Sequence, residues 1–329
     1  MRYRTLGIQV TNRCNMTCDH CITESSPRAR GDLAWEQIEA AIRSAAPHVD
    51  GVCVTGGEPL LRKDTTIRTI RLTRCLGLRS SMVTNGYWYR SAESADRVCR
   101  ELDDAGLQKL AVSFDRFHDR IVSSSSLDRL LAAGARTSIC FQLQYCGDRD
   151  DEAYRIATAA AKRYGVELLS SVVLPFGRGR NLATRSSVSV ATVPDDPCGV
   201  AVRPVLTPEG ELFTCCGPAR GAAGNSPLRL KVRDAGYVGD ALSAGAVDPI
   251  LNVIHVHGPH ALLKRLHPAT QERVAERLLD SSICSLCRSI TDDEHAVHEL
   301  STALEEDRIR LIALSAAMQV AQDQTAART

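Results

Sequence analysis

Residues 6–21 read LGIQVTNRCNMTCDHC, a short apolar run that passes directly into three cysteines spaced C-x-x-x-C-x-x-C. The apolar run predicts a buried β-strand, which places Cys14, Cys18 and Cys21 in the loop that follows it. Three thiolates on one loop can hold three irons of a 4Fe-4S cube and leave the fourth iron open. A structural zinc site is the alternative, but zinc prefers four ligands in a closed tetrahedron, and the only further ligand nearby is His20.

Beyond this loop, short β-rich runs alternate with amphipathic helical stretches as far as residue 175. Strands are predicted at 6–10, 52–55, 80–84, 109–113, 137–145 and 167–174, and helices at 33–46, 65–76, 92–105, 126–133 and 151–164. Repeated strand-helix units imply parallel strands joined by right-handed crossovers. The predicted fold is therefore α/β, a partial (β/α)6 TIM-like barrel. The cysteine loop lies at the carboxyl end of its strand, where such barrels build active sites.

The alternation stops after Phe176, and the chain continues as a small extension. The stretch GRGRNLATRSS, 177–187, is typical of a linker, and VRPVLTPEGELFTCC, 202–216, predicts a β-hairpin that turns at Pro-Glu-Gly. Helices are predicted near 260–280 and 291–322, whereas the segment 217–250 has no assignment. The second helix is expected to pack through an apolar face made of Leu300, Leu304, Ile309, Ile312 and Met318. We divide the chain into a barrel, 1–180, and a hairpin-plus-helices extension, 181–329.

Composition narrows the cellular setting. The 329 residues carry 40 Lys and Arg against 39 Asp and Glu, so no overall field favours nucleic acid or anionic lipid as a partner. No apolar run is long enough to span a membrane, and the polar start MRYRT lacks the features of a signal peptide. The expected location is the cytoplasm. Disulfides are uncommon there, so the 13 cysteines favour metal or thiol chemistry. Five isolated cysteines are expected in the core: Cys53, Cys75, Cys99, Cys140 and Cys146.

The second predicted strand ends in Thr55-Gly56-Gly57-Glu58-Pro59. Together with the cysteine spacing, this stretch resembles the radical S-adenosylmethionine (SAM) superfamily, in which three cysteines hold a 4Fe-4S cluster and SAM chelates its open iron. The resemblance implies that Gly56, Gly57, Glu58 and Pro59 form the GGEP motif, which contacts the SAM amino group. Considered alone, two glycines at this place would more often be an ordinary strand-to-helix turn.

Further strand ends fit the same resemblance. It implies SAM contacts for Asn85, for Ser113 and Asp115, and for Arg178, which follow the third, fourth and sixth predicted strands. Helix capping explains small polar residues at strand ends equally well on local evidence. Relatives usually carry an aromatic residue before the third cysteine. Here His20 holds that position, and its imidazole can still stack on adenine.

A second set of cysteines lies in the extension. Eleven residues separate Cys198 from Gly210, four more precede Cys215, and Cys284 and Cys287 form a C-x-x-C pair. Four such thiolates are also what a structural zinc ribbon offers. The spacing resembles the SPASM and Twitch extensions of radical SAM enzymes, which bind auxiliary 4Fe-4S clusters. Because no cysteine follows Cys287, the Twitch form with one auxiliary cluster on these four thiols is the better match.

Cys216 is left over from this set. Adjacent residues on a strand point to opposite faces, so Cys215 and Cys216 are not expected to bind the same cluster. An isolated cysteine is usually a buried small residue or a spare thiol. Radical SAM peptide epimerases are similar in this region, however, and they pair an auxiliary-cluster cysteine with a thiol that gives a hydrogen atom to a carbon radical. The resemblance therefore implies that Cys216 is catalytic.

The leading functional hypothesis is L-to-D epimerisation of a ribosomally made peptide, with SAM and two 4Fe-4S clusters as cofactors. The alternatives are oxidative crosslinking of a peptide through a thioether or carbon-carbon bond, dehydrogenation of a small alcohol, and a non-catalytic metal-binding protein. Expected partners are a precursor peptide and an electron donor such as flavodoxin or ferredoxin. No leader-binding domain is visible before the first strand, so a separate leader-peptide-binding protein is a further candidate partner. His255, His257 and His260 are expected to be surface or core histidines rather than metal ligands.

Overall fold

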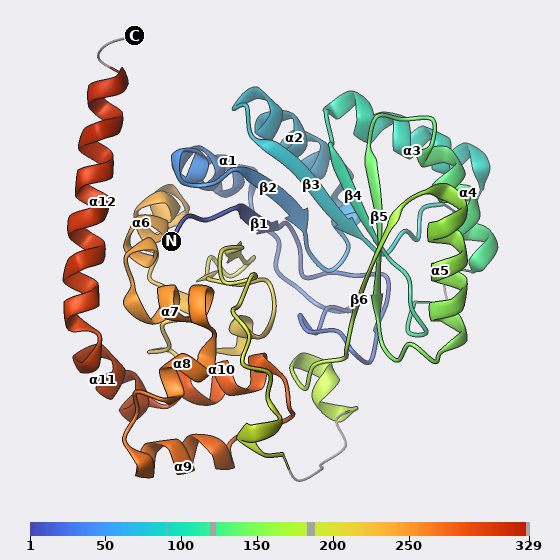
Figure 1. Ribbon diagram of the computed structural model, residues 1–329. Helices are drawn as coiled ribbons and strands as arrows, with labels where there is room; N and C mark the ends of the chain where they lie inside the picture. Colours follow the sequence, from blue (N-terminus) through green and yellow to red (C-terminus); the bar gives the residue numbers. More distant parts are fainter. Residues whose placement is uncertain (90, 119–122, 183–187, 327–329) are drawn as a thin grey trace.

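The computed structural model describes residues 1–89, 91–118, 123–182 and 188–326. Six parallel strands form the centre of the molecule (Figure 1). They are β1 (Thr5–Gln9), β2 (Gly51–Thr55), β3 (Arg79–Thr84), β4 (Lys109–Ser113), β5 (Cys140–Cys146) and β6 (Glu167–Ser171). Each pairs in parallel with its neighbour in chain order. The predicted α/β partial barrel is confirmed.

Helices cover the outer face of the six strands (Figure 1). They are α1 (Trp35–Ala45), α2 (Lys63–Cys75), α3 (Ala92–Ala105), α4 (Ser124–Gly134) and α5 (Glu152–Tyr164). Their buried residues recur at helical spacing, as in Ile38, Ala41 and Ile42 of α1. The strands alternate instead. In β2, Val52 and Val54 are buried, whereas Cys53 and Thr55 are partly exposed and therefore face the interior of the barrel.

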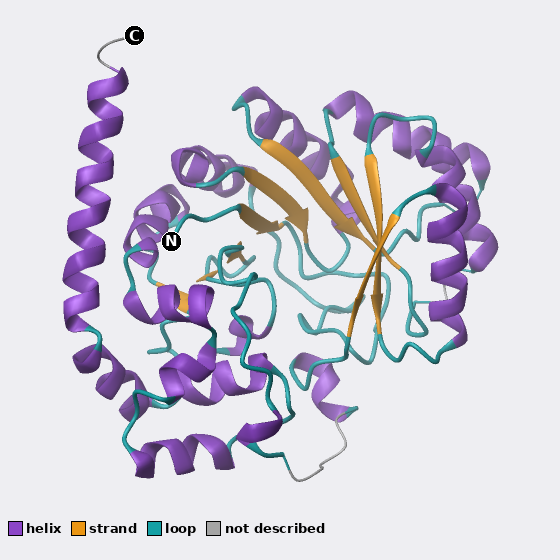
Figure 2. Cartoon of the chain, in the orientation of Figure 1, coloured by secondary structure: helices purple, strands orange, loops and turns teal. Residues whose placement is uncertain are grey.

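The extension continues the sheet from the free edge of β1. β7 (Val205–Leu206) pairs with β1 in parallel, and β8 (Leu212–Phe213) and β9 (Arg229–Leu230) follow it as antiparallel strands. Figure 2 shows how short these strands are beside those of the barrel. The predicted hairpin is confirmed, and Gly210 in its turn has a φ of +79°, a conformation that favours glycine. The linker begins as a 3-10 helix, Gly177–Asn181, and its residues 183–187 lie outside the described residues.

The prediction of two C-terminal helices is wrong, because the extension has seven in the described chain. They are α6 (Val238–Ala246), α7 (Pro249–His257), α8 (Pro259–Leu263), α9 (Pro268–Glu276), α10 (Ile283–Thr291), α11 (Glu294–Ala303) and α12 (Glu305–Ala326). Short 3-10 helices also lie at Ala46–His48, Pro59–Arg62, Val190–Thr192, Pro218–Gly221 and Ala235–Tyr237. Where it is described, the chain has no helix with the length and apolar character that crossing a membrane requires.

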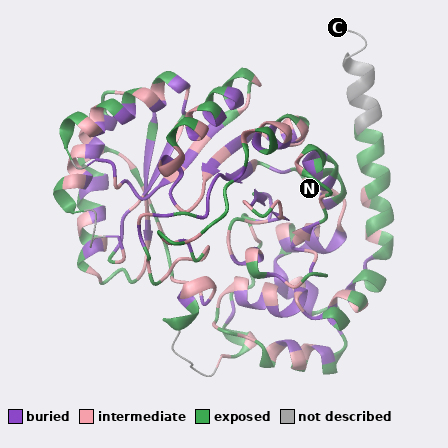
Figure 3. Ribbon diagram, turned by 180° about the vertical axis from the view of Figure 1, so that it is seen from behind, coloured by how far each residue is buried: buried purple, intermediate pink, exposed green. Residues whose placement is uncertain are grey.

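Two packing predictions also need correction. Leu300 and Leu304 are buried, but Ile309, Ile312 and Met318 are 58%, 44% and 56% exposed, because α12 runs alongside the body rather than into it (Figures 1 and 3). Of the five cysteines expected in the core, Cys99 is buried and Cys53 and Cys146 are partly buried, whereas Cys75 and Cys140 are exposed. Cys75 ends α2 and Cys140 starts β5, so both sit where an element meets solvent.

Candidate functional site

The first cysteine set lies in the loop after β1, at the carboxyl end of the sheet. Cys14 is buried, and Cys18 and Cys21 are partly buried. The Cys14 Sγ accepts hydrogen bonds from the backbone N–H of Met16 and from Asn85 Nδ2, both at 3.4 Å. Burial raises the pKa of the Cys14 thiol to about 12, and the neighbouring thiols of Cys18 and Cys21 add to that shift. A group of thiols that raise one another's pKa is a natural cation site, because a bound metal stabilises the thiolates.

The GGEP turn packs against the backbone of this loop. The N–H of Gly57 donates to Thr11 O at 2.8 Å, and the N–H of Glu58 donates to Arg13 O at 2.9 Å. A Cβ on Gly57 would lie only 2.2 Å from Arg13 O, so the approach of the two segments requires glycine. The two glycines therefore form a strand-to-helix turn and also serve the site, because this turn fixes the loop that holds the thiols.

Glu58 is completely buried beside the end of β3. Its oxygens accept hydrogen bonds from Leu60 N at 3.1 Å, Thr84 Oγ1 at 2.9 Å and Asn85 N at 2.8 Å. Burial raises the pKa of Glu58 to about 7 although these donors oppose the shift. A buried carboxylate of this kind is best stabilised by an added cation, such as the ammonium group of SAM. Pro59 is buried next to it and begins the following 3-10 helix.

Asn85 joins the end of β3 to the cysteine loop. Besides its bond to Cys14, its Nδ2 donates to Asn15 Oδ1 at 2.9 Å. Ser113, at the end of β4, is partly buried and lies in register with Gln144 of β5. The structure thus brings Glu58, Asn85 and the Cys14 thiol together, and the expected contact of Ser113 with SAM stays a prediction.

Asp115, His20 and His118 form a compact group behind the cysteine loop. Asp115 is buried, and its Oδ1 accepts from Phe117 N and from His118 Nδ1, both at 2.9 Å. His20 stacks on Phe117 with 4.4 Å between ring centroids. Two buried polar atoms, Asp115 Oδ2 and His20 Nδ1, have no hydrogen-bond partner among the described residues. Unpaired buried atoms at this place fit a bound polar ligand such as SAM.

His118 was missed by the sequence analysis. Its imidazole bonds to Asp115 and also hydrogen-bonds with the Cys18 thiol. Burial favours the neutral ring, but these two partners outweigh burial and raise the pKa of His118 to about 10. The available signal was the D-x-x-H spacing, which places His118 within reach of a carboxylate already assigned to the site.

Arg178 holds the same loop from the far side of the barrel mouth. Its Nε donates to Cys18 O at 2.8 Å, its Nη2 donates to Ser25 O at 2.7 Å, and its backbone N–H donates to Cys21 O at 3.0 Å. The guanidinium therefore supports the backbone around two cysteines. The expected contact of Arg178 with the SAM carboxylate stays a prediction.

The second cysteine set gathers in the extension. The pKa of the Cys287 thiol is raised by burial and then by its neighbours Cys215, Cys198 and Cys284, which places the four thiols in one region. No three of them have their Sγ atoms all within 4.8 Å of one another. Burial also raises the pKa of Cys215 and of Cys284 to about 12. Cys284 and Cys287 lie three residues apart in the first turns of α10, so they share one face of the helix. The helix N-terminus favours an anionic group at this place.

The histidines near this set have ordinary structural partners. His255 Nδ1 lies 3.1 Å from Cys198 O, and His260 Nε2 lies 2.9 Å from Val193 O. The first of these contacts fixes the backbone at Cys198, where the N–H donates to Ile254 O at 3.0 Å.

Cys216 follows Cys215 directly, and its thiol adds to the raised pKa of Cys215 and of Cys284. That Cys216 is not a ligand of the same cluster stays a prediction. The Cys216 side chain is exposed, yet burial raises its pKa, followed by the effect of the nearby Cys53 thiol. Both properties hold for a thiol that lines a space open to solvent and surrounded by protein. Cys216 therefore lies near Cys53 of β2. A raised pKa keeps the thiol protonated at neutral pH.

A pocket of about 590 Å³ lies where the barrel mouth meets the extension. One wall is the end of the cysteine loop, Ile22–Glu24, which directly follows Cys21. Another wall is formed by Gly217, Pro218 and Arg220, which follow Cys216. The pocket is thus lined by residues that adjoin both cysteine sets in the sequence, and it could admit a substrate from outside.

Comparison with known proteins identifies a family and relatives that are similar to this chain in sequence. The model of the Radical SAM superfamily matches residues 8–187. YydG of Bacillus subtilis (strain 168), which carries the name of a peptide biosynthesis protein, is 22% identical over 226 residues, 67% of this chain and 71% of YydG. The GTP 3',8-cyclase of Peptoclostridium acidaminophilum is 32% identical over 139 residues, 40% of this chain, and the match spans only 41% of that cyclase.

Solved structures share the fold. Native anSMEcpe with bound AdoMet and Cp18Cys peptide superimposes with a TM-score of 0.51 at 13% identity, covering 95% of this chain and 99% of that one. Streptococcus suis SuiB bound to precursor peptide SuiA gives a TM-score of 0.55 at 11% identity, covering 87% and 71%. Because the family model matches more than half of the chain, including the cysteine loop and the GGEP turn, this protein belongs to the radical SAM superfamily and is an enzyme that uses SAM and 4Fe-4S chemistry.

Proposed function

We propose that this enzyme acts on a ribosomally made precursor peptide and inverts one amino acid from L to D at Cα. The observation that carries the proposal is Cys216, an accessible and protonated thiol beside the pocket between the two cysteine sets. The similarity to YydG, and the peptides bound in the anSMEcpe and SuiB structures, support a peptide as the substrate class.

In this proposal Cys14, Cys18 and Cys21 hold the cluster that binds SAM, and Cys198, Cys215, Cys284 and Cys287 hold one auxiliary 4Fe-4S cluster in a Twitch-like extension. Gly56 to Pro59, Asn85, Ser113, Asp115, His20 and Arg178 bind or orient SAM. The division of the chain at residue 180 follows the same assignment. When bound and reduced, SAM and its cluster would supply a 5'-deoxyadenosyl radical able to remove the hydrogen atom from Cα of the substrate.

Cys216 then completes the inversion. Its S–H bond breaks, a new Cα–H bond forms on the opposite face, and the sulfur is left as a thiyl radical. One electron from a reductant such as flavodoxin or ferredoxin and one proton from solvent restore the thiol. The donor must be a protonated thiol, and the raised pKa of Cys216 supplies that state at neutral pH. The need for a cellular reductant and the free cysteines both fit an enzyme of the cytoplasm.

Oxidative crosslinking of the peptide, or dehydrogenation of a small alcohol, is the alternative that the second cysteine set favours. Four thiols gathered near the barrel mouth could carry a cluster that removes the second electron. Such a product would be lighter by two hydrogen atoms, whereas an inverted product keeps the mass of its substrate.

The test uses the reconstituted enzyme and a precursor peptide identified among the neighbouring genes, in deuterated water. Because the Cys216 thiol exchanges with solvent, the inverted residue should carry one deuterium at Cα. The Cys216→Ala variant should keep both clusters and SAM cleavage while losing the inverted product, and Cys140→Ala serves as a matched control at an exposed cysteine. A product lighter by two hydrogens, or a Cys216→Ala enzyme that still inverts its peptide, would exclude this donor.

A further inference from the structure

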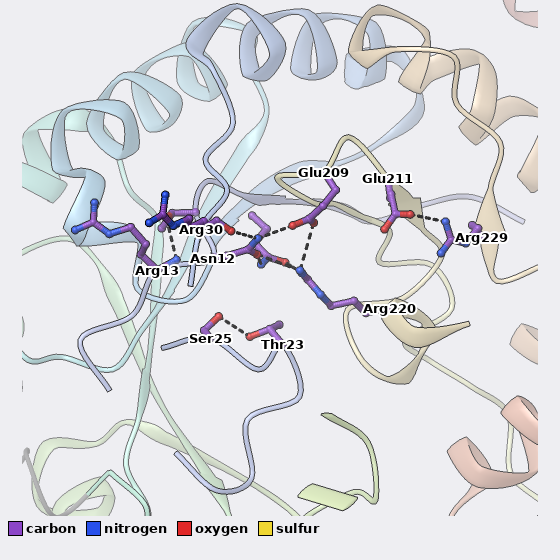
Figure 4. A network of polar contacts seen from close by, with 11 residues as sticks. Asn12, Arg13, Thr23, Ser25, Arg30, Glu209, Glu211, Arg220 and Arg229 are labelled. Atoms are coloured by element: carbon purple, nitrogen blue, oxygen red, sulfur yellow. Dashed lines mark hydrogen bonds and ion pairs between the residues drawn. The ribbon is translucent and has the colours of Figure 1, made fainter. Parts of the chain in front are cut away.

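A polar network connects the hairpin of the extension to the loop that carries the first cysteine set (Figure 4). Arg220 donates through Nη1 to Gln9 Oε1, and through Nη2 to Asn12 Oδ1 at 3.0 Å and to Glu209 Oε2 at 3.3 Å. Asn12 Nδ2 in turn donates to Glu209 Oε1 at 2.5 Å and to Arg30 O at 2.9 Å. One guanidinium thus joins its own 3-10 helix to two other segments, the end of β1 and the hairpin turn.

The network adjoins both groups of thiols along the chain. Asn12 stands two residues before Cys14, and Arg220 stands four residues after Cys216 in the 3-10 helix Pro218–Gly221. Arg220 also lines the pocket between the two cysteine sets. A shift of Arg220 relative to Asn12 would therefore change the position of Cys216 relative to the SAM-binding loop.

Burial makes this link specific. Gln9 and Asn12 are 2% and 7% exposed, and Arg220 is the only donor to Gln9 Oε1 among the described residues. Losing Arg220 leaves that buried acceptor unpaired, which strongly favours rearrangement of the surrounding loops. Gly31 packs closely against Asn12 in this network. Its φ is +111°, and a Cβ there would lie 2.7 Å from Asn12 Nδ2.

We propose that Arg220, held by Glu209 and Asn12, is a positioning residue that sets the register between the SAM-binding loop and the Cys215–Cys216 segment. The inference rests on the proposed function, in which Cys216 has to reach the radical that forms beside the SAM-binding loop. Hydrogen return must follow hydrogen abstraction at one Cα, so the donor thiol has to stand opposite the radical site. A displacement of about 1 Å at a reacting centre can reduce a rate on the order of 100-fold.

The experiment compares four reconstituted holoenzymes: wild type, Arg220→Ala, Arg220→Lys and Arg229→Ala. The Arg229→Ala variant is a matched control, because Arg229 donates to Glu211 at 2.5 Å on the same hairpin and both residues belong to the extension (Figure 4). Pulsed electron paramagnetic resonance measures the distance distribution between the two reduced clusters. The second readout is the amount of modified peptide per 5'-deoxyadenosine, measured with the same precursor peptide and whatever the chemistry of the modification.

The expected result is a narrow distance distribution in wild type and Arg229→Ala, and a shifted or broadened one in Arg220→Ala. The yield of modified peptide per 5'-deoxyadenosine should fall about tenfold or more in Arg220→Ala, with SAM cleavage retained. Arg220→Lys should recover part of both properties, because an ammonium group still reaches one or two of the three acceptors.

Failure of this inference and failure of the proposed function give different results. An Arg220→Ala enzyme with full iron content, an unchanged distance distribution and an unchanged yield would overturn the positioning role. Equal losses in Arg220→Ala and Arg229→Ala would also overturn it, because they would show general damage to the hairpin. A wild-type enzyme with only one cluster, or a product that is not inverted, would contradict the proposed function instead.

Discussion

His118 Nδ1 lies 2.9 Å from the buried Asp115 Oδ1, and the same imidazole hydrogen-bonds with the Cys18 thiol. Asp115 follows β4, whereas Cys18 belongs to the loop after β1, so this histidine joins two distant strand ends. Asp115 also fixes the orientation of the His118 ring, because its Oδ1 accepts a hydrogen bond from Nδ1–H. The carboxylate is thereby oriented with its second oxygen 3.6 Å from His20 Nε2 and without a hydrogen-bond partner among the described residues.

The His118–Asp115 pair should stabilise the cluster-free protein in a pH-dependent way. Because the folded pKa of His118 is raised to about 10, its stabilising contribution is complete below about pH 6.5 and is lost as the pH rises through 10. His118→Gln should therefore reduce the free energy of unfolding by a few kcal/mol near pH 6 and by much less near pH 10. Urea denaturation at both pH values measures the difference. Equal losses at both would show that the charged pair is not the source of the stability.

Glu58 should also make the stability depend on pH, but because the fold favours its neutral form rather than a charged one. Its folded pKa is raised to about 7, so its burial costs nothing while the carboxyl is protonated in both states. Between pH 4.5 and 7 the unfolded chain loses the proton first, and the stability of the cluster-free protein falls. The wild type should therefore lose stability relative to Glu58→Gln across this range, by on the order of a few kcal/mol, and the difference should be constant above pH 8. A difference that does not change between pH 5 and 8, measured by urea denaturation, would contradict the prediction.

The barrel was predictable from sequence because each of its units repeats the same local pattern. All six strands and their five helices were found, with ends that differ by a few residues. The extension lacks that repetition. Three of its missed helices begin with proline, at Pro249, Pro259 and Pro268, which is the position where proline fits a helix best. These starts are local signals: Pro249 lies in the segment left without assignment, and Pro259 and Pro268 lie at the edge of and within the continuous helix predicted near 260–280.

The site shows the same division between local and distant information. Cysteine spacing and the GGEP turn are local, so the candidate ligands and the SAM contacts could be proposed from the sequence. Arg220 and Gln9 are 211 positions apart, and no spacing rule connects them. Their contact depends on β7 pairing with β1, which only the folded sheet reveals.

The exposed apolar residues of α12 should contribute little to folding. Leu304, at its junction with α11, is 1% exposed, whereas Ile309 is 58% exposed one to two turns later. Leu304→Ala should lower the free energy of unfolding by about 2 to 5 kcal/mol, because it leaves a cavity. Ile309→Ala, the matched change on the exposed face, should alter it by about 0.5 kcal/mol or less. Comparable losses in the two variants, measured by urea denaturation, would mean that α12 packs against the body through both residues.

The metal content separates the two cysteine sets. Anaerobically reconstituted wild type should bind about eight irons with matching sulfide, as two 4Fe-4S cubes. Alanine at Cys14, Cys18 and Cys21 should leave about half of the iron and abolish SAM cleavage. Alanine at Cys284 and Cys287 should also leave about half, but on the SAM-binding loop, so the perturbation of the cluster spectrum by added SAM should persist.

The competing outcome is a zinc site in the extension, since four thiols around one centre suit zinc as well as a cube. Burial and mutual proximity raise the pKa of all three thiols Cys215, Cys284 and Cys287, and either metal would relieve that cost by binding thiolates. Metal analysis of anaerobically isolated protein distinguishes the two cases. One zinc and about four irons per chain would exclude the auxiliary cluster. About eight irons without zinc would support an auxiliary cluster in the extension.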